Sequence, residues 1–233
     1  MNIIITGASR GIGYETAKIL SKEHRVIGIA RSIAGQDLKS QPTYIPISFD
    51  FERGNIKKDL LPQIEKHFSH VDILINNAAT FIKKPFEEIS RENFEKVFRV
   101  NVFAVAELTQ AVLTLMNNAG RDLKSRPTSH VLNIASMGGI QGSVKFPELS
   151  AYSASKGALI TLTECLAEEY RGKNISFNAI AFGAVQTEML TEAFPRFKAP
   201  VTAKEAAEFV SNFAVTGQKY CNGKVLQLAL STP

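Results

Sequence analysis

The sequence predicts a single-domain α/β fold built on a doubly wound, mostly parallel sheet of seven strands, with helices on both faces. Seven short apolar runs alternate with helical patterns along the 233 residues. Strands and helices that alternate in this way pair in parallel through right-handed crossovers. The runs are apolar almost throughout, which is typical of strands buried on both faces. Composition does not shift along the chain, so we expect one domain over residues 1–233.

The predicted elements follow from hydrophobic periodicity. Two helices have the clearest patterns. One, over residues 91–116, carries apolar residues at spacings of three and four, with Asn101 on the same stripe; the other begins near Ala151 and ends before Gly172. We expect surface loops at 117–129 and 194–201. The predicted strands are residues 2–6, 25–30, 44–48, 71–75, 130–135, 175–180 and 224–228.

Composition excludes several classes of protein. Charged residues make up 21% of the chain and no long uncharged apolar run occurs, so we expect no membrane span. Met1 leads directly into the first strand, which favours a cytoplasmic protein without a leader. The net charge of +5 is scattered in short pairs, which argues against nucleic-acid binding and suits attraction of an anionic dinucleotide. Cys165 and Cys221 have no partners at metal-ligand or disulfide spacing, and we expect both to be buried thiols.

A glycine-rich turn follows the first strand, and a helix follows the turn. Glycine permits positive φ and a close approach of the backbone to a pyrophosphate, while the helix N-terminus favours the negative charge. A tight turn without a ligand is the alternative. The context predicts a dinucleotide site in a Rossmann-type fold. The candidate residues are Gly7, Ser9, Arg10, Gly11, Ile12 and Gly13.

The end of the second predicted strand indicates which dinucleotide binds. NAD-binding folds usually present an acidic residue there to the ribose 2′-hydroxyl. This chain has Arg31 and Ser32 instead, and Arg31 and Arg10 can offer donors to a 2′-phosphate. The sequence therefore favours NADP(H) over NAD. The alternative is that both arginines are ordinary solvated charges.

A tyrosine and a lysine lie four residues apart at the start of the helix near Ala151. Tyr152 and Lys156 therefore share one face of that helix. A free tyrosine has a pKa near 10, and a cation about 4 Å away contributes roughly 4 kcal/mol at an effective dielectric near 20, so we expect Lys156 to lower the Tyr152 pKa. Ser136 follows the fifth strand, where its hydroxyl can hold a substrate oxygen. Taken singly, such a pair or such a serine is common, and only the combination is specific.

Taken together, these motifs make the chain resemble the short-chain dehydrogenase/reductase family, over essentially its whole length. The matches occur in the family's order, and five independent motifs at matching intervals are improbable by chance. They are the turn Thr6 to Gly13, Asn76-Asn77-Ala78, Asn101, Ser136, the pair Tyr152 and Lys156, and the segment from Gly183 to Thr187.

The resemblance implies roles for these residues. Tyr152 would exchange the proton with the substrate, Lys156 would lower its pKa and bind the nicotinamide ribose, and Ser136 would position the substrate oxygen. Asn101 would complete a water-linked proton relay, or serve as a satisfied core amide. For the cofactor, the resemblance implies that Asp50 and Phe51 lie at the adenine, that Asn77 and Ala78 support the nicotinamide side, and that Gly183, Val185 and Thr187 engage the carboxamide. A helix N-cap is the alternative for Asp50.

The chain departs from the family pattern at Ala79 and Phe182, which replace a usual Gly and Pro, and in a slightly long interval between Ser136 and Tyr152. We expect Ala79 to be tolerated, because it adds only a methyl group, and the long interval to border the substrate pocket. Met189, Leu190, Phe194 and Phe197 predict an apolar lid, or residues that only pack the lid onto the domain.

The expected function is an NADP(H)-dependent oxidoreductase acting on a small carbonyl or alcohol. Two alternatives are a catalytically inactive NADP-binding regulator and an epimerase. The resemblance also implies a homodimer or homotetramer.

Overall fold

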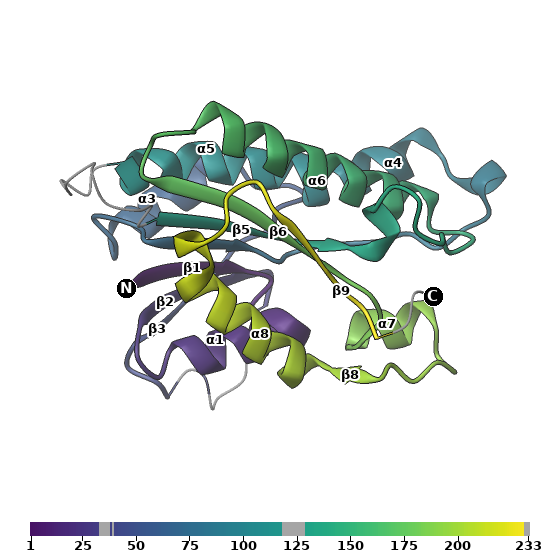
Figure 1. Ribbon diagram of the computed structural model, residues 1–233, viewed down its shortest axis with the longest axis horizontal. Coiled ribbons are helices and arrows are strands. Elements are labelled where there is room, and N and C mark those ends of the chain that lie inside the picture. Colours follow the sequence, from purple (N-terminus) through teal and green to yellow (C-terminus); the bar gives the residue numbers. More distant parts are fainter. Residues whose placement is uncertain (33–37, 39, 118–128, 231–233) are drawn as a thin grey trace.

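The protein is a three-layer sandwich with a parallel sheet between two layers of helices (Figure 1). This computed structural model describes residues 1–32, 38, 40–117 and 129–230. Most of the loop predicted over 117–129 lies outside the described residues.

The seven predicted strands all form, and they join one sheet. The spatial order is β3-β2-β1-β4-β5-β6-β9, and every neighbouring pair is parallel. The chain runs outward from β1 in one direction to β3 and then crosses back to β4, so the order reverses between β1 and β4. Ligands bind at the carboxyl ends of strands beside such a reversal. The strands are β1 (Asn2–Thr6), β2 (Arg25–Ala30), β3 (Tyr44–Ser48), β4 (Ile73–Asn76), β5 (Ser129–Ser136), β6 (Ile175–Phe182) and β9 (Val225–Leu228).

Alternating side chains of β1 supply the cores on both faces of the sheet. Ile4 packs in the core beneath the upper helices, whereas Ile3 and Ile5 pack toward the lower ones. All three are fully buried. The upper layer in Figure 1 contains α3 (Leu61–Glu65), α4 (Arg91–Phe98), α5 (Ala104–Asn117) and α6 (Ser150–Glu169); the lower layer contains α1 (Gly11–Leu20) and α8 (Ala203–Thr216).

The helix predicted over residues 91–116 forms, but its middle widens. A π-helical turn, η3 (Arg99–Phe103), joins α4 to α5 and places Asn101 in the interior. Such turns are frequent at functional sites. The run Arg91–Met116 is also long and apolar enough to meet a criterion for a membrane-crossing helix, although half of its apolar window is buried inside the protein. A buried core helix meets this criterion as well, so the expectation of no membrane span stays a prediction.

Short elements complete the fold. Between β3 and α6 these are η1 (Ile56–Leu60), η2 (Phe86–Glu88) and η4 (Met137–Gly139). Beyond β6, the strands β7 (Val185–Gln186) and β8 (Val201–Thr202) pair with each other on either side of α7 (Glu188–Ala193), and η5 (Gly217–Lys219) follows α8.

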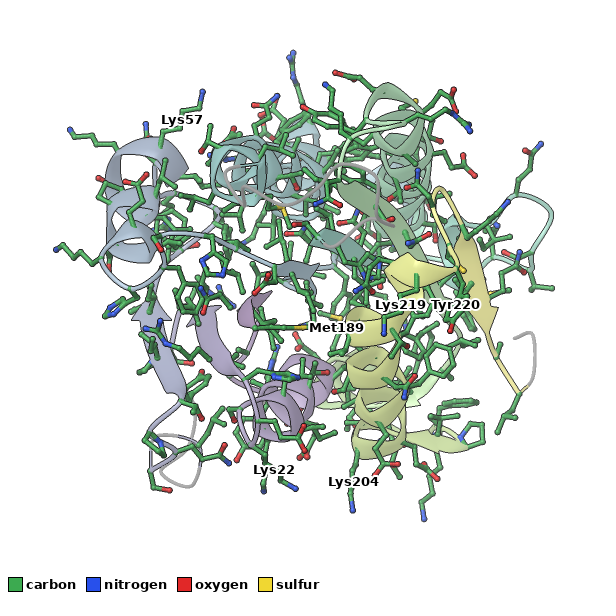
Figure 2. All side chains as sticks on the ribbon, turned by 60° about the vertical axis from the view of Figure 1, so that its left-hand side comes forward. Lys22, Lys57, Met189, Lys204, Lys219 and Tyr220 are labelled. Atoms are coloured by element: carbon green, nitrogen blue, oxygen red, sulfur yellow. The ribbon has the colours of Figure 1, made fainter. Side chains whose placement is uncertain are left out.

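Surface groups are distributed as follows. Lys22, Lys57 and Lys204 extend outward from separate elements in Figure 2, so these three charges do not gather in one patch. Both cysteines are free, but Cys165 is exposed on α6 and Cys221 is only partly buried, so the prediction that both thiols are buried was wrong. The apolar stripe of α6 is carried by other residues, Leu159 among them, which leaves Cys165 on the outer face.

Candidate active site

A cavity of about 520 Å³ lies at the carboxyl edge of the sheet, beside the reversal of strand order. It extends from the glycine turn after β1 to the segment around α7. Nearly all the predicted site residues line it, although they come from distant parts of the sequence. They are Gly7, Ser9, Arg10, Gly11, Ile12, Arg31, Ser32, Asp50, Phe51, Asn77, Ala78, Ser136, Tyr152, Lys156, Gly183, Val185 and Thr187.

The glycine turn has the geometry that a phosphate cradle needs. Gly7 and Gly11 have φ values of +70° and +57°, a region that side chains disfavour. Gly13 lies behind the turn at the start of α1, where a Cβ would stand 2.4 Å from the carbonyl oxygen of Gly7 and 2.3 Å from Nδ2 of Asn77. The turn therefore keeps its backbone close to the cavity because glycine occupies these positions.

Thr6 and Asn77 hold the turn against the end of β4. The Thr6 hydroxyl accepts hydrogen bonds from the backbone N–H groups of Asn77 (3.0 Å) and Ala78 (2.9 Å). The Asn77 amide donates to the carbonyl oxygens of Thr6 (3.0 Å) and Gly7 (3.2 Å). The side chain of Asn77 thus shapes the cradle, and Asn77 and Ala78 both line the cavity.

Two exposed arginines, Arg10 and Arg31, are among the residues that line the cavity. Arg10, Arg31 and Ser32 are exposed and line the cavity together with Asp50 and Phe51. Phe51 is buried and packs edge-on against Phe49, with ring centroids 5.1 Å apart.

Asp50 closes a local turn rather than capping a helix. Its Oδ1 accepts a hydrogen bond from the N–H of Glu52 at 2.9 Å. Asn55 is the cap of the next helical turn, η1, because its side chain accepts from the N–H of Lys58. The helix N-cap alternative for Asp50 was therefore wrong, and one carboxylate oxygen of Asp50 is free of this turn bond.

Ser136, Tyr152 and Lys156 meet in the same cavity. Ser136 ends β5, where its Oγ accepts from the N–H of Gly138 at 3.2 Å, and its side chain hydrogen-bonds Tyr152. Tyr152 and Lys156 lie on one face of α6, with Nζ 5.7 Å from the centroid of the phenol ring. The Lys156 ammonium donates to the carbonyl oxygen of Ile134 at 2.7 Å. The lysine is therefore fixed between the helix and β5.

Burial dominates the titration of this pair. Burial raises the pKa of Tyr152 above its ordinary value, and the hydrogen bond with Ser136 lowers it by less. Burial also lowers the pKa of Lys156 to about 8. The expected lowering of the Tyr152 pKa by Lys156 is thus not what the structure gives, because desolvation of the phenolate outweighs the hydrogen bond with Ser136. Tyr152 is accordingly a protonated phenol at neutral pH, and Lys156 is mostly charged.

Asn101 lies outside the cavity lining and ties three segments together. Its Oδ1 accepts from the N–H of Thr80 at 2.8 Å, and its Nδ2 donates to the Thr80 carbonyl oxygen and to Ser155 Oγ, both at 2.9 Å. Ser155 Oγ in turn donates to the carbonyl oxygen of Tyr152 at 2.7 Å. The amide is fully buried and satisfied. Asn101 therefore has the geometry of a core amide that positions the first turn of α6.

The substrate end of the cavity is enclosed by apolar side chains. Met189, Leu190, Phe194 and Phe197 of the predicted lid all line it. Thr187 caps α7 by accepting from the N–H of Leu190 at 3.2 Å, and Val185 is buried in the short strand before it. Lid residues that only pack onto the domain were the alternative, and their place in the lining favours the lid.

Several site residues were not predicted from the sequence. Thr80 and Ser155 act through hydrogen bonds between distant segments, which leave no local pattern, and Thr6 was recognised only as the start of the glycine turn. Phe146 and Leu149 line the cavity from the long interval before Tyr152, where a border to the pocket was expected without named residues. Ala79 keeps an ordinary negative φ, so the usual glycine is not required there.

Comparison with known proteins is consistent with this geometry. The family model described as short chain dehydrogenase matches residues 1–197. The 3-oxoacyl-(acyl-carrier-protein) reductase of Thermotoga maritima is 30% identical, over 96% of this chain and 94% of its own. The Pseudomonas aeruginosa RhlG/NADP complex has a TM-score of 0.82 and 26% identity, covering 98% and 94%. A 4-hydroxyisoleucine dehydrogenase mutant with NADH and succinate has a TM-score of 0.84 and 25% identity, covering 98% and 97%.

Proposed function

This chain belongs to the short chain dehydrogenase family, and we propose that it transfers a hydride between NADP(H) and the carbonyl or alcohol carbon of a small molecule. The observation that carries the proposal is the cavity in which Ser136, Tyr152 and Lys156 meet at one end of a glycine-rich cradle. A family member of this kind is an oxidoreductase, and here the proton-transfer groups stand beside a site shaped for a dinucleotide.

The residues present fit a nicotinamide dinucleotide. Gly7 and Gly11 with positive φ leave room for a pyrophosphate, and the amides at the start of α1 favour its charge. Asp50 and Phe51 would hold the adenine side, Lys156 the nicotinamide ribose, and Gly183, Val185 and Thr187 the carboxamide. When bound, the cofactor supplies the hydride.

The chain itself handles the proton and the developing charge. Ser136 holds the substrate oxygen, and the Tyr152 phenol donates its proton to that oxygen as the carbonyl is reduced. Burial keeps Tyr152 protonated at neutral pH, which suits reduction, and alcohol oxidation requires the reverse transfer to a phenolate. Lys156, anchored on Ile134, keeps a positive charge beside the phenol.

The preference for NADP(H) rests on Arg10 and Arg31. Both line the cavity, and neither has an acidic partner among the described residues. A guanidinium matches a phosphate with two parallel hydrogen bonds. We expect Arg31→Ala to weaken NADPH binding about tenfold and to leave NADH binding within about twofold. Titration calorimetry measures both, with Arg171→Ala as control; equal losses for the two cofactors would contradict the assignment.

The test of the function is Tyr152→Phe, assayed by NADPH oxidation with cyclohexanone, acetophenone, 4-carboxyacetophenone and an acetoacetyl thioester. We expect turnover to fall by about a hundredfold or more while NADPH affinity stays within a few-fold, because only the proton donor is lost. Tyr220→Phe, on an exposed tyrosine, is the control. Unchanged turnover would refute the role of Tyr152. NADPH binding without oxidation in the wild-type protein would favour the inactive regulator.

We also propose a homodimer or homotetramer, as the family resemblance implies. Phe103 of η3 is half exposed beside the ring of Phe98, and Leu230 is largely exposed after β9. Exposed aromatic groups of this size are typical of contact surfaces. Sedimentation equilibrium decides between the monomer and these assemblies.

A further inference from the structure

One lysine outside the catalytic set joins three segments around the substrate end of the cavity. Lys83 lies in the loop after β4, and its Nζ donates to the carbonyl oxygen of Ala193, the last residue of α7, at 3.0 Å. The same Nζ stands 4.7 Å from the ring centroid of Phe194 and 3.4 Å from Oε2 of Glu148. Lys83 therefore connects the loop after β4, the loop before α6 and the end of the lid.

The aromatic ring that Lys83 contacts is part of the cavity wall. Phe194 packs against Phe146 with ring centroids 5.2 Å apart, and both rings line the cavity. Lys83 does not line it but stands against Phe194. A cation over a ring and a charge-assisted hydrogen bond to the adjacent carbonyl act on neighbouring residues, so together they fix the position of that ring.

The third partner, Glu148, is held in an unusual conformation. Its φ of +68° is the only positive value at a non-glycine residue in the described part of the chain. Its carbonyl oxygen accepts from the N–H of Lys84 at 3.0 Å, while its carboxylate faces Lys83. Such a conformation persists only where the surroundings enforce it, and here it lies two residues before the helix that carries Tyr152. The loop after β4 thus holds this residue by both its backbone and its side chain.

We propose that Lys83 is a positioning residue that holds Phe194 against Phe146, and that the resulting fixed wall selects carbonyl substrates whose group next to the carbonyl is apolar and uncharged. This rests on the proposed function. The positive charge of Lys83 is balanced by Glu148, so it offers little attraction to an anionic substrate. The wall itself is apolar; its members include Phe81, Met137, Phe146, Leu149, Phe194 and Phe197.

The first test needs no substrate. Lys83→Met keeps an unbranched apolar side chain one atom shorter, and removes the hydrogen bond, the ion pair and the cation over the ring. Lys84→Met is the matched control, because Lys84 contributes its backbone N–H. We expect hydrogen exchange of the amides of residues 188–197, followed by mass spectrometry, to accelerate about tenfold in Lys83→Met. Less than threefold acceleration, or equal acceleration in Lys84→Met, would overturn the proposal.

The second test separates positioning from general damage. With saturating NADPH and acetophenone, we expect Lys83→Met to raise KM about tenfold and to leave kcat within about threefold, because the wall orients the substrate without touching the reacting atoms. A lowered kcat at constant KM would overturn it. The wild-type protein should reduce acetophenone at least tenfold more efficiently than 4-carboxyacetophenone; equal efficiency would overturn the selectivity.

The two proposals fail in different ways. No oxidation of NADPH with any of the four carbonyl compounds would refute the function, and the exchange measurement would still decide whether Lys83 holds the lid. A normal reductase with unchanged exchange in Lys83→Met would refute only the role of Lys83.

Discussion

A histidine in the core makes the stability of the protein sensitive to acid. His130 lies in β5 and is completely buried. Its Nδ1 is 2.9 Å from the carbonyl oxygen of Ala214, so Nδ1 carries the hydrogen and donates it. Its Nε2 then accepts from the amide of Asn178 at 3.0 Å. Both ring nitrogens are thus satisfied in the neutral form, and burial lowers the pKa of His130 to about 4.

The sign and size of the effect follow from this pKa. The unfolded chain takes up a proton at His130 below about pH 6.5, whereas the folded chain does so only near pH 4. Stability is therefore complete above pH 6.5 and is lost as the pH falls toward 4. Each pKa unit corresponds to about 1.4 kcal/mol, so at pH 5 this residue alone reduces the free energy of unfolding by about 2 kcal/mol relative to pH 8.

The assay is urea unfolding of the wild-type protein and of His130→Gln at pH 8, 6.5 and 5. Glutamine can donate to Ala214 and accept from Asn178 but does not titrate, so its stability should fall by about 2 kcal/mol less than that of the wild type between pH 8 and 5. His67→Gln, at an exposed histidine, should follow the wild type. Parallel pH dependences in wild type and His130→Gln would refute the reasoning.

Two further predictions concern the site. Gly13→Ala should destabilise the protein by about 1–3 kcal/mol and weaken NADPH binding, because the added Cβ would meet the Gly7 carbonyl and the Asn77 amide. Thermal unfolding measures the loss of stability, and calorimetry measures the loss of binding. A stable variant with normal NADPH binding would contradict this packing. The kcat/KM for ketone reduction should be level near neutral pH and fall above about pH 8, where the Lys156 ammonium is lost; a profile that stays level to pH 9.5 would contradict it.

The sheet was predictable from the sequence because its strands carry their signal locally. The first three strands end where the apolar runs end, and the glycine turn was recognised from its place between a strand and a helix. The break in the helix over residues 91–116 was not predictable, since η3 keeps the apolar stripe and changes only the hydrogen bonding around Asn101.

The geometry of the site was predictable less fully. The motifs predict which residues line the cavity. They do not predict the direction in which the Tyr152 pKa shifts, because that depends on how completely α6 and β5 exclude water from the phenol. The contacts of Lys83 were equally hidden, since Glu148, Ala193 and Phe194 are brought to it only by the tertiary fold.

The cradle also has a consequence for the order in which the protein acquires activity. A Cβ at Gly11 would stand 3.4 Å from the Thr187 side chain. The glycine turn after β1 therefore borders a segment that is synthesised much later. A growing polypeptide that emerges from the ribosome can form β1 and the glycine turn early, but the segment around Thr187 that borders this turn has not yet been synthesised. We therefore expect nascent chains that stop before residue 187 to retain no dinucleotide, and cofactor capture to report that synthesis has passed this point.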